Sequence, residues 1–561
     1  MKSFINNNPA FIFILTIYAL ISIFLVGFHD YSSDSSLYSV RALGWTDYMG
    51  SSQKGPVQWL GHSTWWSSLS FQDAPPVVFG MQYIFFRLFG GATSSAQILF
   101  LLAGVILLCS VYFYVQKIKD TETAVWSSVA FGVSSLALWS TTSGNLEGVQ
   151  SLFIILNFLT TLLYIKYNKD KYLYFAIVFM GLALMSKYTS IFIIPSFLAS
   201  LYIWKSRQEK SSAERDIKIS KYFYSTLLLF IIILPTFIYN FHLYKLRGNF
   251  DTALSAMVGM ENELNRSMNF DFVRNIFDIV SVLFSTGSFL YVALCLISFL
   301  YIVIKSQQRK TDIFEDSLII YISMFFIMLG FMGGGARWLP LFIPFFSIAL
   351  GLLIVEIRKK YSSRAILFLF IFILLFEFAY SVNTNLFLNP VGRVGVFSSN
   401  IRNSNAGFNE LEEYLNKELS PLGEKYRVSK AEELELLAPN PIDVEDKIIM
   451  YDGRVNWFAK WWYLEKYFVY YKIKVFSYDN GGIRNTVFPK NSIENSNLKG
   501  SGKTVYFIEA VDPRVMNADI SSSLGERLLA FSQDLQKKNI PSVDIVNKHG
   551  KVAFRVYKIT F

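Results

Sequence analysis

The sequence predicts a polytopic α-helical membrane protein of about eleven transmembrane helices, with a C-terminal extracytoplasmic α/β domain. Hydrophobic residues make up 53% of the 561 residues and charged residues only 17%, with a mean hydropathy of +0.36. This composition is too apolar for a soluble globule. Apolar runs of about 20 residues, the length needed to cross a bilayer, recur along the first part of the chain. Beyond them, helix-like and strand-like stretches alternate, which is typical of a small α/β domain.

The first apolar run, Phe11 to Phe28, follows a single basic residue, Lys2. It is nearly membrane-length and has no small-residue cleavage site, so we interpret it as an uncleaved span and not as a signal peptide. Lys187 and Pro195 interrupt the apolar stretch that would hold two later spans, which makes that pair the least regular. The further spans are expected near 93–115, 123–142, 147–165, 172–187, 189–204, 223–243, 275–304, 317–333, 338–356 and 364–384.

The net charge of +10 comes from 52 basic and 42 acidic residues. The basic residues lie in short clusters between apolar runs, which is the pattern of topology signals, so we expect no nucleic-acid partner. If the N-terminus is cytoplasmic, these clusters fall in cytoplasmic loops. An odd number of spans then places everything after about residue 386 outside the cytoplasm. The clusters are Lys117 and Lys119; Lys166, Lys169 and Lys171; KSRQEKSSAERDIKISK; KSQQRK; and RKKYSSR.

Two domains are expected, a membrane domain over 1–388 and an extracytoplasmic α/β domain over 389–561, with a long first outside loop at about 29–92. The second domain has helix-like stretches, NELEEYLNKEL and SLGERLLAFSQDLQKKN, and strand-like ones, DKIIMYDG, KTVYFIEAV and VAFRVYKITF. It has no metal-ligand spacing, phosphate-binding loop or nucleophile motif. We therefore expect a structural or acceptor-recruiting module.

The stretch FHDYSSDSSLYSVRALG follows the first span and carries two carboxylates where the chain leaves the bilayer. Ser33 can cap a helix that runs from Asp34 to about Leu43 and stops at Gly44. Asp34, Tyr38 and Arg41 would then share one helix face. Asp30 lies in the approach to this helix, where we expect looser geometry. The alternative for Asp34 is an ordinary acid in the favourable field of a helix N-terminus.

The remainder of the first loop is rich in tryptophan, with Trp45, Trp59, Trp65 and Trp66. Tryptophan favours the bilayer interface, and its flat face also suits sugar rings. The segment from Pro75 to Phe89 is apolar but short, and its double proline fits a helix start. We expect it to lie along the outer membrane surface.

Several motifs together resemble the membrane glycosyltransferases of the protein O-mannosyltransferase and lipid A aminoarabinose transferase group, the C-type superfamily. They are the acid-bearing DSSLYSVRA and a PP-hydrophobic helix that ends in RLFGG, followed by WSTTSGNLEGVQSLFIILNFLTTLLY, GLALMSKYTSIFIIPSFL and GGGARWLPLFIPFF. The last three contain Glu147, Lys187 and Arg337, respectively. The resemblance covers the chain up to about residue 390.

The resemblance implies a sugar donor linked to a polyprenyl phosphate and an inverting transfer to an acceptor on the extracytoplasmic face. It also singles out Asp34 as the acidic residue of the first loop. Many relatives have Asp-Glu at this point, whereas this chain has Asp34-Ser35. Asp30 or Asp73 could replace the missing acid, or nothing does.

Sugar transfer needs a base for the acceptor proton and positive charge near the departing phosphate. We assign the base to Asp34 and the phosphate to Lys187 and Arg337, since each cation lies at the outer end of an apolar span. The alternative for either cation is a side chain that snorkels to the interface. Glu147 is either a further site residue or a helix cap. The expected substrate-binding residues are thus Asp30, Tyr38, Asp73, Glu147, Lys187 and Arg337.

Asp30, Asp34 and Asp73 could hold a divalent cation, but no ligand spacing favours a metal, and no other cofactor is indicated. The partners expected are the lipid-linked donor, membrane lipids and a protein, lipid or glycan acceptor. The rival function is a transporter or flippase, which would place ionisable residues near the bilayer midplane. Glu377 is the deepest acid, whereas the other candidates lie near span ends. A sensor or scaffold would not need so many spans.

Overall fold

The computed structural model forms two compact units. The first contains residues up to Val26, Phe71–Met81 and Gln97–Arg402, and the second contains Gly27–Ser70, Gln82–Ala96 and Asn403–Phe561. The structure describes residues 8–31, 33–43, 75–209, 219–247, 250–251, 254–255, 271–333, 335–361, 363–402, 404–420, 446–471, 473–478, 496, 498–517 and 522–561.

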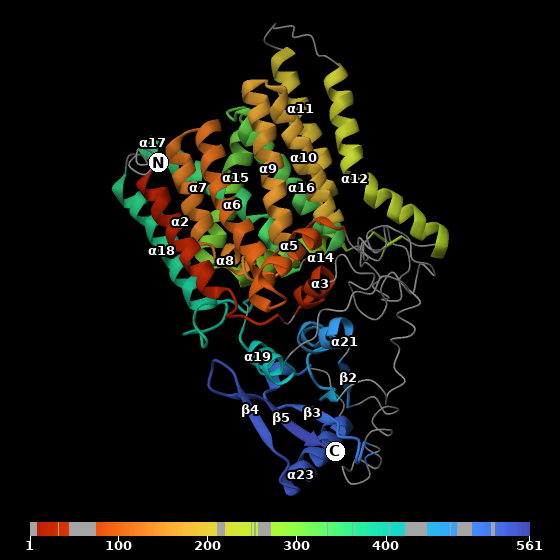
Figure 1. Cartoon of the computed structure of the whole chain (residues 1–561). Coiled ribbons are helices and arrows are strands. Elements are labelled where there is room, and N and C mark those ends of the chain that lie inside the picture. Colours follow the sequence, from red (N-terminus) through yellow and green to blue (C-terminus); the bar gives the residue numbers. More distant parts are fainter. Residues whose placement is uncertain are drawn as a thin grey trace. The chain divides into compact units, whose positions relative to one another are not determined.

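The first unit is helical (Figure 1). Six of its described helices are long and apolar enough to cross a membrane, namely Thr93–Ile118, Leu146–Tyr167, Lys221–Phe241, Phe289–Gln307, Ile313–Phe331 and Arg364–Asn385. The expected total of about eleven spans stays a prediction. The helices are α2 (Pro9–Leu25), α6 (Thr93–Ile118), α7 (Thr121–Val133), α8 (Ser135–Ser140), α9 (Leu146–Tyr167), α10 (Asp170–Ser186), α11 (Ile193–Glu209), α12 (Ile219–Arg247), α14 (Phe272–Thr286), α15 (Phe289–Gln307), α16 (Ile313–Met332), α17 (Ile343–Tyr361) and α18 (Arg364–Asn385). The residues of α5 (Val77–Phe89) up to Met81 are assigned to the first unit and those from Gln82 on to the second.

Two expected spans are each divided into two helices, so the prediction of one continuous helix at 123–142 and at 275–304 is wrong. The first breaks at Ser134, between α7 and α8, and the second at Gly287 and Ser288, between α14 and α15. Glu377 of α18 explains why both breaks are tolerated. Its Oε1 accepts a hydrogen bond from the Ser135 N–H at 3.0 Å, and its Oε2 accepts one from the Ser288 N–H at 2.8 Å. At each of these two buried helix starts, one backbone N–H group that has no partner within its own helix thus has an acceptor.

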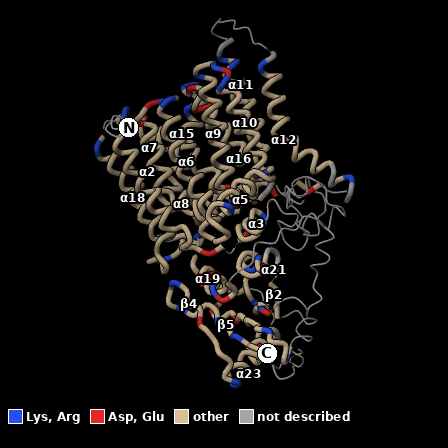
Figure 2. Tube along the Cα trace, viewed as in Figure 1, with Lys and Arg blue, Asp and Glu red and all other residues tan. Residues whose placement is uncertain are grey.

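The expected cytoplasmic clusters gather at one end of the first unit, where they pair with acids. Figure 2 shows Lys and Arg concentrated at the end of α11 and its neighbours. These ion pairs join loops that are far apart in the sequence. The loops that the sequence predicted to share one side of the membrane therefore do lie together in the fold. The pairs are Lys119–Asp312, Arg207–Asp316, Lys221–Asp170, Lys305–Glu356, Arg358–Glu122 and Lys359–Asp120.

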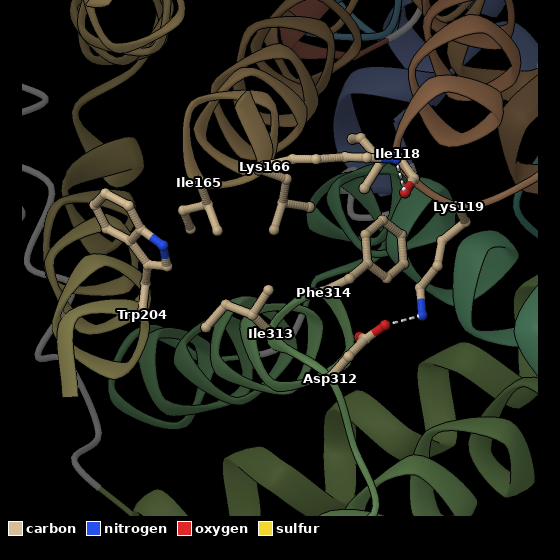
Figure 3. Close-up of a pocket in the computed structure, with 9 residues that line it drawn as sticks. Ile118, Lys119, Ile165, Lys166, Trp204, Asp312, Ile313 and Phe314 are labelled. Carbon is tan, nitrogen blue, oxygen red and sulfur yellow. Dashed lines mark hydrogen bonds and ion pairs between the residues drawn. The ribbon is translucent and has the colours of Figure 1, made fainter. Parts of the chain in front are cut away.

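A cavity of about 230 Å³ opens at this charged end (Figure 3). Lys119 bonds Asp312, and Lys166 donates to the carbonyl oxygens of Lys117 and Ile118, so both lysines already have partners. The side chains that line it are Ile118, Lys119, Leu162, Ile165, Lys166, Trp204, Asp312, Ile313 and Phe314.

The second unit contains a five-stranded mixed sheet with the order β2-β1-β3-β5-β4. Its strands are β1 (Lys447–Tyr451), β2 (Lys474–Ser477), β3 (Thr504–Ala510), β4 (Ser542–Val546) and β5 (Val552–Thr560). β1 pairs in parallel with β2 and β3, with Ile449 opposite Val475 and Tyr506, whereas β5 runs antiparallel to β3 and β4. The predicted α/β character and the strands at β1, β3 and β5 are confirmed, while β2 and β4 were missed.

Successive side chains of a strand point to opposite faces of the sheet, and in β1 and β3 nearly all of them are buried. Both faces of the sheet therefore need a cover. On one face, α23 (Ser522–Lys537) contributes Leu528, Phe531 and Leu535 to a cluster with Val505 and Phe507. Elsewhere α19 (Phe408–Glu418) reaches β5, where the Phe408 ring meets the Phe554 ring at 5.1 Å. Both helices were predicted, and both are confirmed. A π-helical turn, η4 (Trp461–Glu465), leads into α21 (Lys466–Tyr471).

Helices α17 and α7 pack closely at Gly351. A Cβ added to Gly351 of α17 would lie 2.8 Å from the Ser127 backbone nitrogen and 3.0 Å from the Thr123 oxygen of α7. Backbone atoms cannot move aside, so Gly351→Ala should destabilise the unit by about 1–3 kcal/mol. The matched control is Gly525→Ala in α23, where nothing lies within 4 Å and higher helix propensity should add up to about 1 kcal/mol. Thermal unfolding of detergent-solubilised protein should show these opposite signs, and equal effects would contradict the packing.

Candidate functional site

The acid-bearing helix of the first loop forms where the sequence predicted it. α3 spans Asp34–Leu43, and Asp34, Tyr38 and Arg41 lie on one half-buried face of it. The Ser36 N–H bonds the Ser33 carbonyl oxygen at 3.0 Å, which begins the first turn. The Nε of Arg41 is buried and has no hydrogen-bond partner within the described residues. The face therefore combines an acid, a phenol and a cation.

α3 is anchored inside the second unit. The Gln82 side-chain amide donates to Ser39 Oγ at 3.1 Å and to the Ala96 carbonyl oxygen at 3.0 Å. On the chain just before α3, the Tyr31 ring lies 6.4 Å from the ring of Trp462 in η4. Residues of the C-terminal domain thus contribute to the surroundings of the first-loop acid.

The expectation of loose geometry at Asp30 is wrong. This carboxylate is buried and accepts four backbone N–H groups. Oδ2 accepts those of Ala406, Gly407 and Phe408 at 2.6, 3.0 and 3.2 Å, and Oδ1 accepts that of Asn409 at 3.0 Å. Burial and the neighbouring charge of Glu410 raise the pKa of Asp30 to about 7, against the lowering effect of the N–H donors.

A polar network continues from this point into the C-terminal domain. The Tyr463 hydroxyl accepts the Tyr31 N–H at 2.9 Å and donates to Asn409 Oδ1 at 2.8 Å. Thr93 accepts from the Trp462 indole at 2.8 Å and donates to Glu412 at 2.9 Å, and Glu412 pairs with buried Lys466. Burial, followed by the charges of Asp30 and Glu412, raises the pKa of Tyr463 well above its usual value. None of these partners was identified from the sequence.

In the first unit, Glu147 and Lys187 form a buried ion pair. Lys187 ends α10 in an extended conformation, with φ of −163°, and its Nζ lies 2.5 Å from Glu147 Oε1 at the start of α9. The Glu147 side chain is 1% exposed and that of Lys187 is 14% exposed. Asn145, and not Glu147, occupies the N-cap position of α9. Glu147 lies in the first turn of the helix and pairs with Lys187.

Trp338 brings Arg337 to the same cluster. Lys187 Nζ lies 4.1 Å from the centroid of the Trp338 ring, and Arg337 Cζ lies 5.0 Å from it. Both contacts are within cation–π range. The turn that carries them, η3 (Ala336–Leu341), follows the glycine-rich end of α16. Glu147, Lys187 and Arg337, which were singled out in three distant stretches of the sequence, therefore lie in one cluster, which Trp338 completes.

Two further residues hold the Lys187 turn and were missed. Gln150, one turn after Glu147, donates to Thr189 Oγ1 at 3.0 Å and to Ser190 Oγ at 2.8 Å. Tyr188 donates to buried Asp251 at 2.5 Å. Within the described residues, Glu147 Oε2 and Gln150 Oε1 are buried and accept no hydrogen bond. The spacing Glu147 to Gln150 on one helix face was the available signal.

Some predicted features fall outside the described residues. They are Asp73, Gly44 and the tryptophans Trp45, Trp59, Trp65 and Trp66.

The described residues do not fit a divalent cation. No group of three or more His, Cys, Asp or Glu side chains in them could hold one. The Asp30 oxygens are already bonded to N–H groups, and Glu147 is paired with Lys187. A cation would have to displace these partners, so we derive no metal-dependent step.

Breaking the Glu147–Lys187 pair on one side should be costly, because the remaining charge stays buried. Glu147→Leu should destabilise the protein by about 3–5 kcal/mol, whereas Glu147→Leu combined with Lys187→Met should restore most of the loss. Thermal unfolding of the purified variants measures both. Losses that simply add in the double variant would show that the two side chains do not interact.

Comparison with known proteins supports the resemblance noted in the sequence. A family model described as dolichyl-phosphate-mannose-protein mannosyltransferase matches residues 73–239, which include Glu147 and Lys187. No curated protein matches the chain in sequence.

Solved structures share the fold at low identity. ArnT from Cupriavidus metallidurans, bound to undecaprenyl phosphate, aligns over 98% of this chain and 97% of its own, with 9% identity and a TM-score of 0.52. Its apo state gives 9% identity, the same coverage and a TM-score of 0.51. The Archaeoglobus fulgidus oligosaccharyltransferase, in complex with Zn and sulfate, aligns over 98% of this chain and 75% of its own, with 13% identity and a TM-score of 0.50. In fold, and over 73–239 in sequence, the chain therefore resembles the C-type membrane glycosyltransferases.

Proposed function

We propose that the chain is an inverting glycosyltransferase that moves a sugar from a polyprenyl-phosphate donor to an acceptor on the extracytoplasmic face of the cell membrane. The observation that carries the proposal is the cluster of Lys187, Arg337, Trp338 and Glu147. Two cations, Lys187 and Arg337, lie against one tryptophan ring among apolar helices, an arrangement that suits a phosphate. The likeness to ArnT bound to undecaprenyl phosphate supports a lipid-linked donor.

Lys187 and Arg337 have the task of stabilising the phosphate as it leaves. Negative charge on the phosphate grows as the sugar–oxygen bond breaks, and fixed cations in a dry site lower the energy of that state. Glu147 holds the Lys187 ammonium in one place through their 2.5 Å contact. Trp338 gives both cations a flat, apolar neighbour, so the charges are kept without extensive hydration.

Asp34 is the proposed general base. It takes the proton from the acceptor hydroxyl or amine while the acceptor oxygen or nitrogen attacks the anomeric carbon and the phosphate departs from the opposite side. One bond forms and one breaks at that carbon, so its configuration inverts. Tyr38 and Arg41 share the helix face of Asp34 and would orient the substrate beside it. Asp73 keeps its proposed substrate-binding role. We do not assign that role to Asp30, because its carboxylate accepts hydrogen bonds from four backbone N–H groups.

The proposed topology places the N-terminus in the cytoplasm and the C-terminal domain outside it. The paired Lys and Arg clusters at one end of the first unit support this orientation. The acceptor is a protein, lipid or glycan that presents a nucleophile on the extracytoplasmic side.

A transporter or flippase is the alternative function. It would use buried ionisable groups within the spans as binding or proton-carrying sites. Glu377, the deepest acid found in the sequence, instead bonds the backbone N–H groups of Ser135 and Ser288. Since both of its oxygens are used for helix ends, the transporter reading has less support.

The deciding experiment supplies labelled polyprenyl-phosphate sugars to membranes that contain the protein. Transfer of label to a protein, lipid or glycan product supports the enzyme. Movement of intact labelled lipid between leaflets without a new product would instead identify a flippase.

Arg337→Ala should weaken donor binding about 10–100-fold, since a charge-assisted contact to phosphate is worth about 1.5–3 kcal/mol. Lys187→Ala should act in the same direction. The matched control is Arg358→Ala, a cation at the charged end of the same unit that pairs with Glu122. Binding of a polyprenyl phosphate to purified protein measures the effect. Unchanged binding in both site variants would remove the phosphate assignment.

Asp34→Asn should lower the rate of sugar transfer about 10²–10⁴-fold, because the amide keeps the size of the side chain but cannot accept the proton. Donor binding should stay normal. Asp544→Asn, which alters an exposed carboxylate paired with Arg555, serves as the control at equal protein abundance. Near-normal transfer by Asp34→Asn would make this residue an ordinary helix-start acid and move the search for the base to Asp73 or Glu147.

A further inference from the structure

Helix α19 of the C-terminal domain begins without a cap of its own. Its N-cap position is Gly407, which has a φ of +119° and no side chain to accept a hydrogen bond. A Cβ at this position would lie 2.3 Å from the Cβ of Ala553 on β5, so close packing excludes a capping residue such as Ser or Asp. The N–H groups at the start of α19 therefore need an acceptor from elsewhere in the chain.

Asp30 supplies that acceptor from the first loop, 376 residues away from Ala406 in sequence. Its two oxygens accept the N–H groups of Ala406, Gly407, Phe408 and Asn409. A carboxylate at a helix N-terminus also has favourable electrostatics, and its charge strengthens each bond. The carboxylate is thus fully used by backbone donors.

The bonds also run in the opposite direction. The Asn409 side-chain amide donates to the carbonyl oxygens of Gly27 and His29 at 3.2 and 3.0 Å. The Asp30 N–H donates to the Ser404 carbonyl oxygen at 3.0 Å. Together, Gly27–Tyr31 and Ser404–Asn409 form what we term the first-loop clamp.

The clamp is directly connected to α3. Tyr31 is the last residue of the clamped segment, and its carbonyl oxygen accepts the Ser36 hydroxyl at 3.0 Å. Ser36 lies in the first turn of α3, two residues after Asp34. A shift of the clamped segment would therefore move the helix start that carries the acid.

We infer that Asp30 is a positioning residue, which fixes the Asp34 helix by capping α19 through the first-loop clamp. The C-terminal domain then takes part in the transfer reaction by holding the proposed base. This inference rests on the proposed function of Asp34. It concerns the placement of the base, so it predicts a loss of turnover without a loss of donor affinity.

The test uses the full-length protein with Asp30→Asn and Asn409→Ala. In Asp30→Asn, an amide NH₂ would replace one of two oxygens that face N–H donors, so the cap is broken at constant size. Turnover at saturating donor should fall about 10²-fold, the cost expected for a displacement near 1 Å, while the donor KM stays unchanged. Asn409→Ala removes the bonds from the Asn409 side chain to the carbonyl oxygens of Gly27 and His29. It should also lower turnover without changing the donor KM, but by a smaller factor. Asp534→Asn, in a half-buried pair with Lys538, is the matched control.

A second measurement reports the clamp without any activity. Ala42→Cys places a thiol at a buried position of α3 and leaves the bond from the Ser36 hydroxyl to Tyr31 intact. A maleimide should modify this thiol slowly in the parent and at least ten times faster in combination with Asp30→Asn or Asn409→Ala. If Asp30→Asn fails to accumulate, Asn409→Ala carries both measurements.

The outcomes separate the two hypotheses. Normal turnover together with a protected Cys at position 42 in the Asp30 and Asn409 variants would overturn the positioning role. A reduced amount of folded protein with unchanged turnover per folded molecule would also overturn it, since that indicates a purely structural role. If Asp34→Asn transfers sugar normally but the Asp30 variant still exposes the thiol, the clamp exists and the assignment of Asp34 as the base fails.

Discussion

Buried helix ends need hydrogen-bond acceptors, and in this protein carboxylates from distant segments provide them. Asp30 bonds the start of α19 in the second unit, and Glu377 bonds the starts of α8 and α15 in the first. An unsatisfied N–H in an apolar environment costs several kcal/mol, so these bonds constrain where the helices can lie. The interrupted helices and the placement of the first loop both depend on them.

The cation cluster follows a related principle of charge compensation. Lys187 ends a helix at a point where it would be costly to keep an isolated charge. Glu147 supplies the opposite charge, Gln150 holds the next residues of the turn, and Trp338 shields the ammonium from one direction. Arg337 lies against the same Trp338 ring, so two cations from distant parts of the chain are held next to one aromatic side chain.

Local pattern was sufficient for α3, α19 and α23 and for three of the five strands. α3 was predicted from a capping serine and a four-residue spacing, and β1, β3 and β5 from apolar runs bounded by turn residues. β2 and β4 are short edge strands, and most of β4 is exposed, so neither has a strong apolar signal. The breaks at Ser134 and Gly287 escaped notice because Glu377, far along the chain, is what satisfies the freed N–H groups.

The candidate site was predictable only in part, for the same reason. Glu147, Lys187 and Arg337 were found through the order of motifs, whereas their association through Trp338 required the fold. Trp338 was visible in the sequence as the neighbour of Arg337, but an aromatic residue at a membrane interface is usually an anchor. Asp30 was misjudged because its partners lie at Ala406–Asn409. A glycine before a predicted helix, as in AGFNE, was the signal that the cap would come from elsewhere.

The capping of α19 also bears on how the protein is made. Asp30 leaves the ribosome early, and its four N–H donors are synthesised more than 370 residues later. Domains fold largely in the order of their synthesis, so the first loop must wait, unclamped, while the helices of the first unit are inserted. The first loop can be clamped only after residue 409 has been synthesised. Products truncated before residue 406 would therefore contain the first loop without its partners in the clamp.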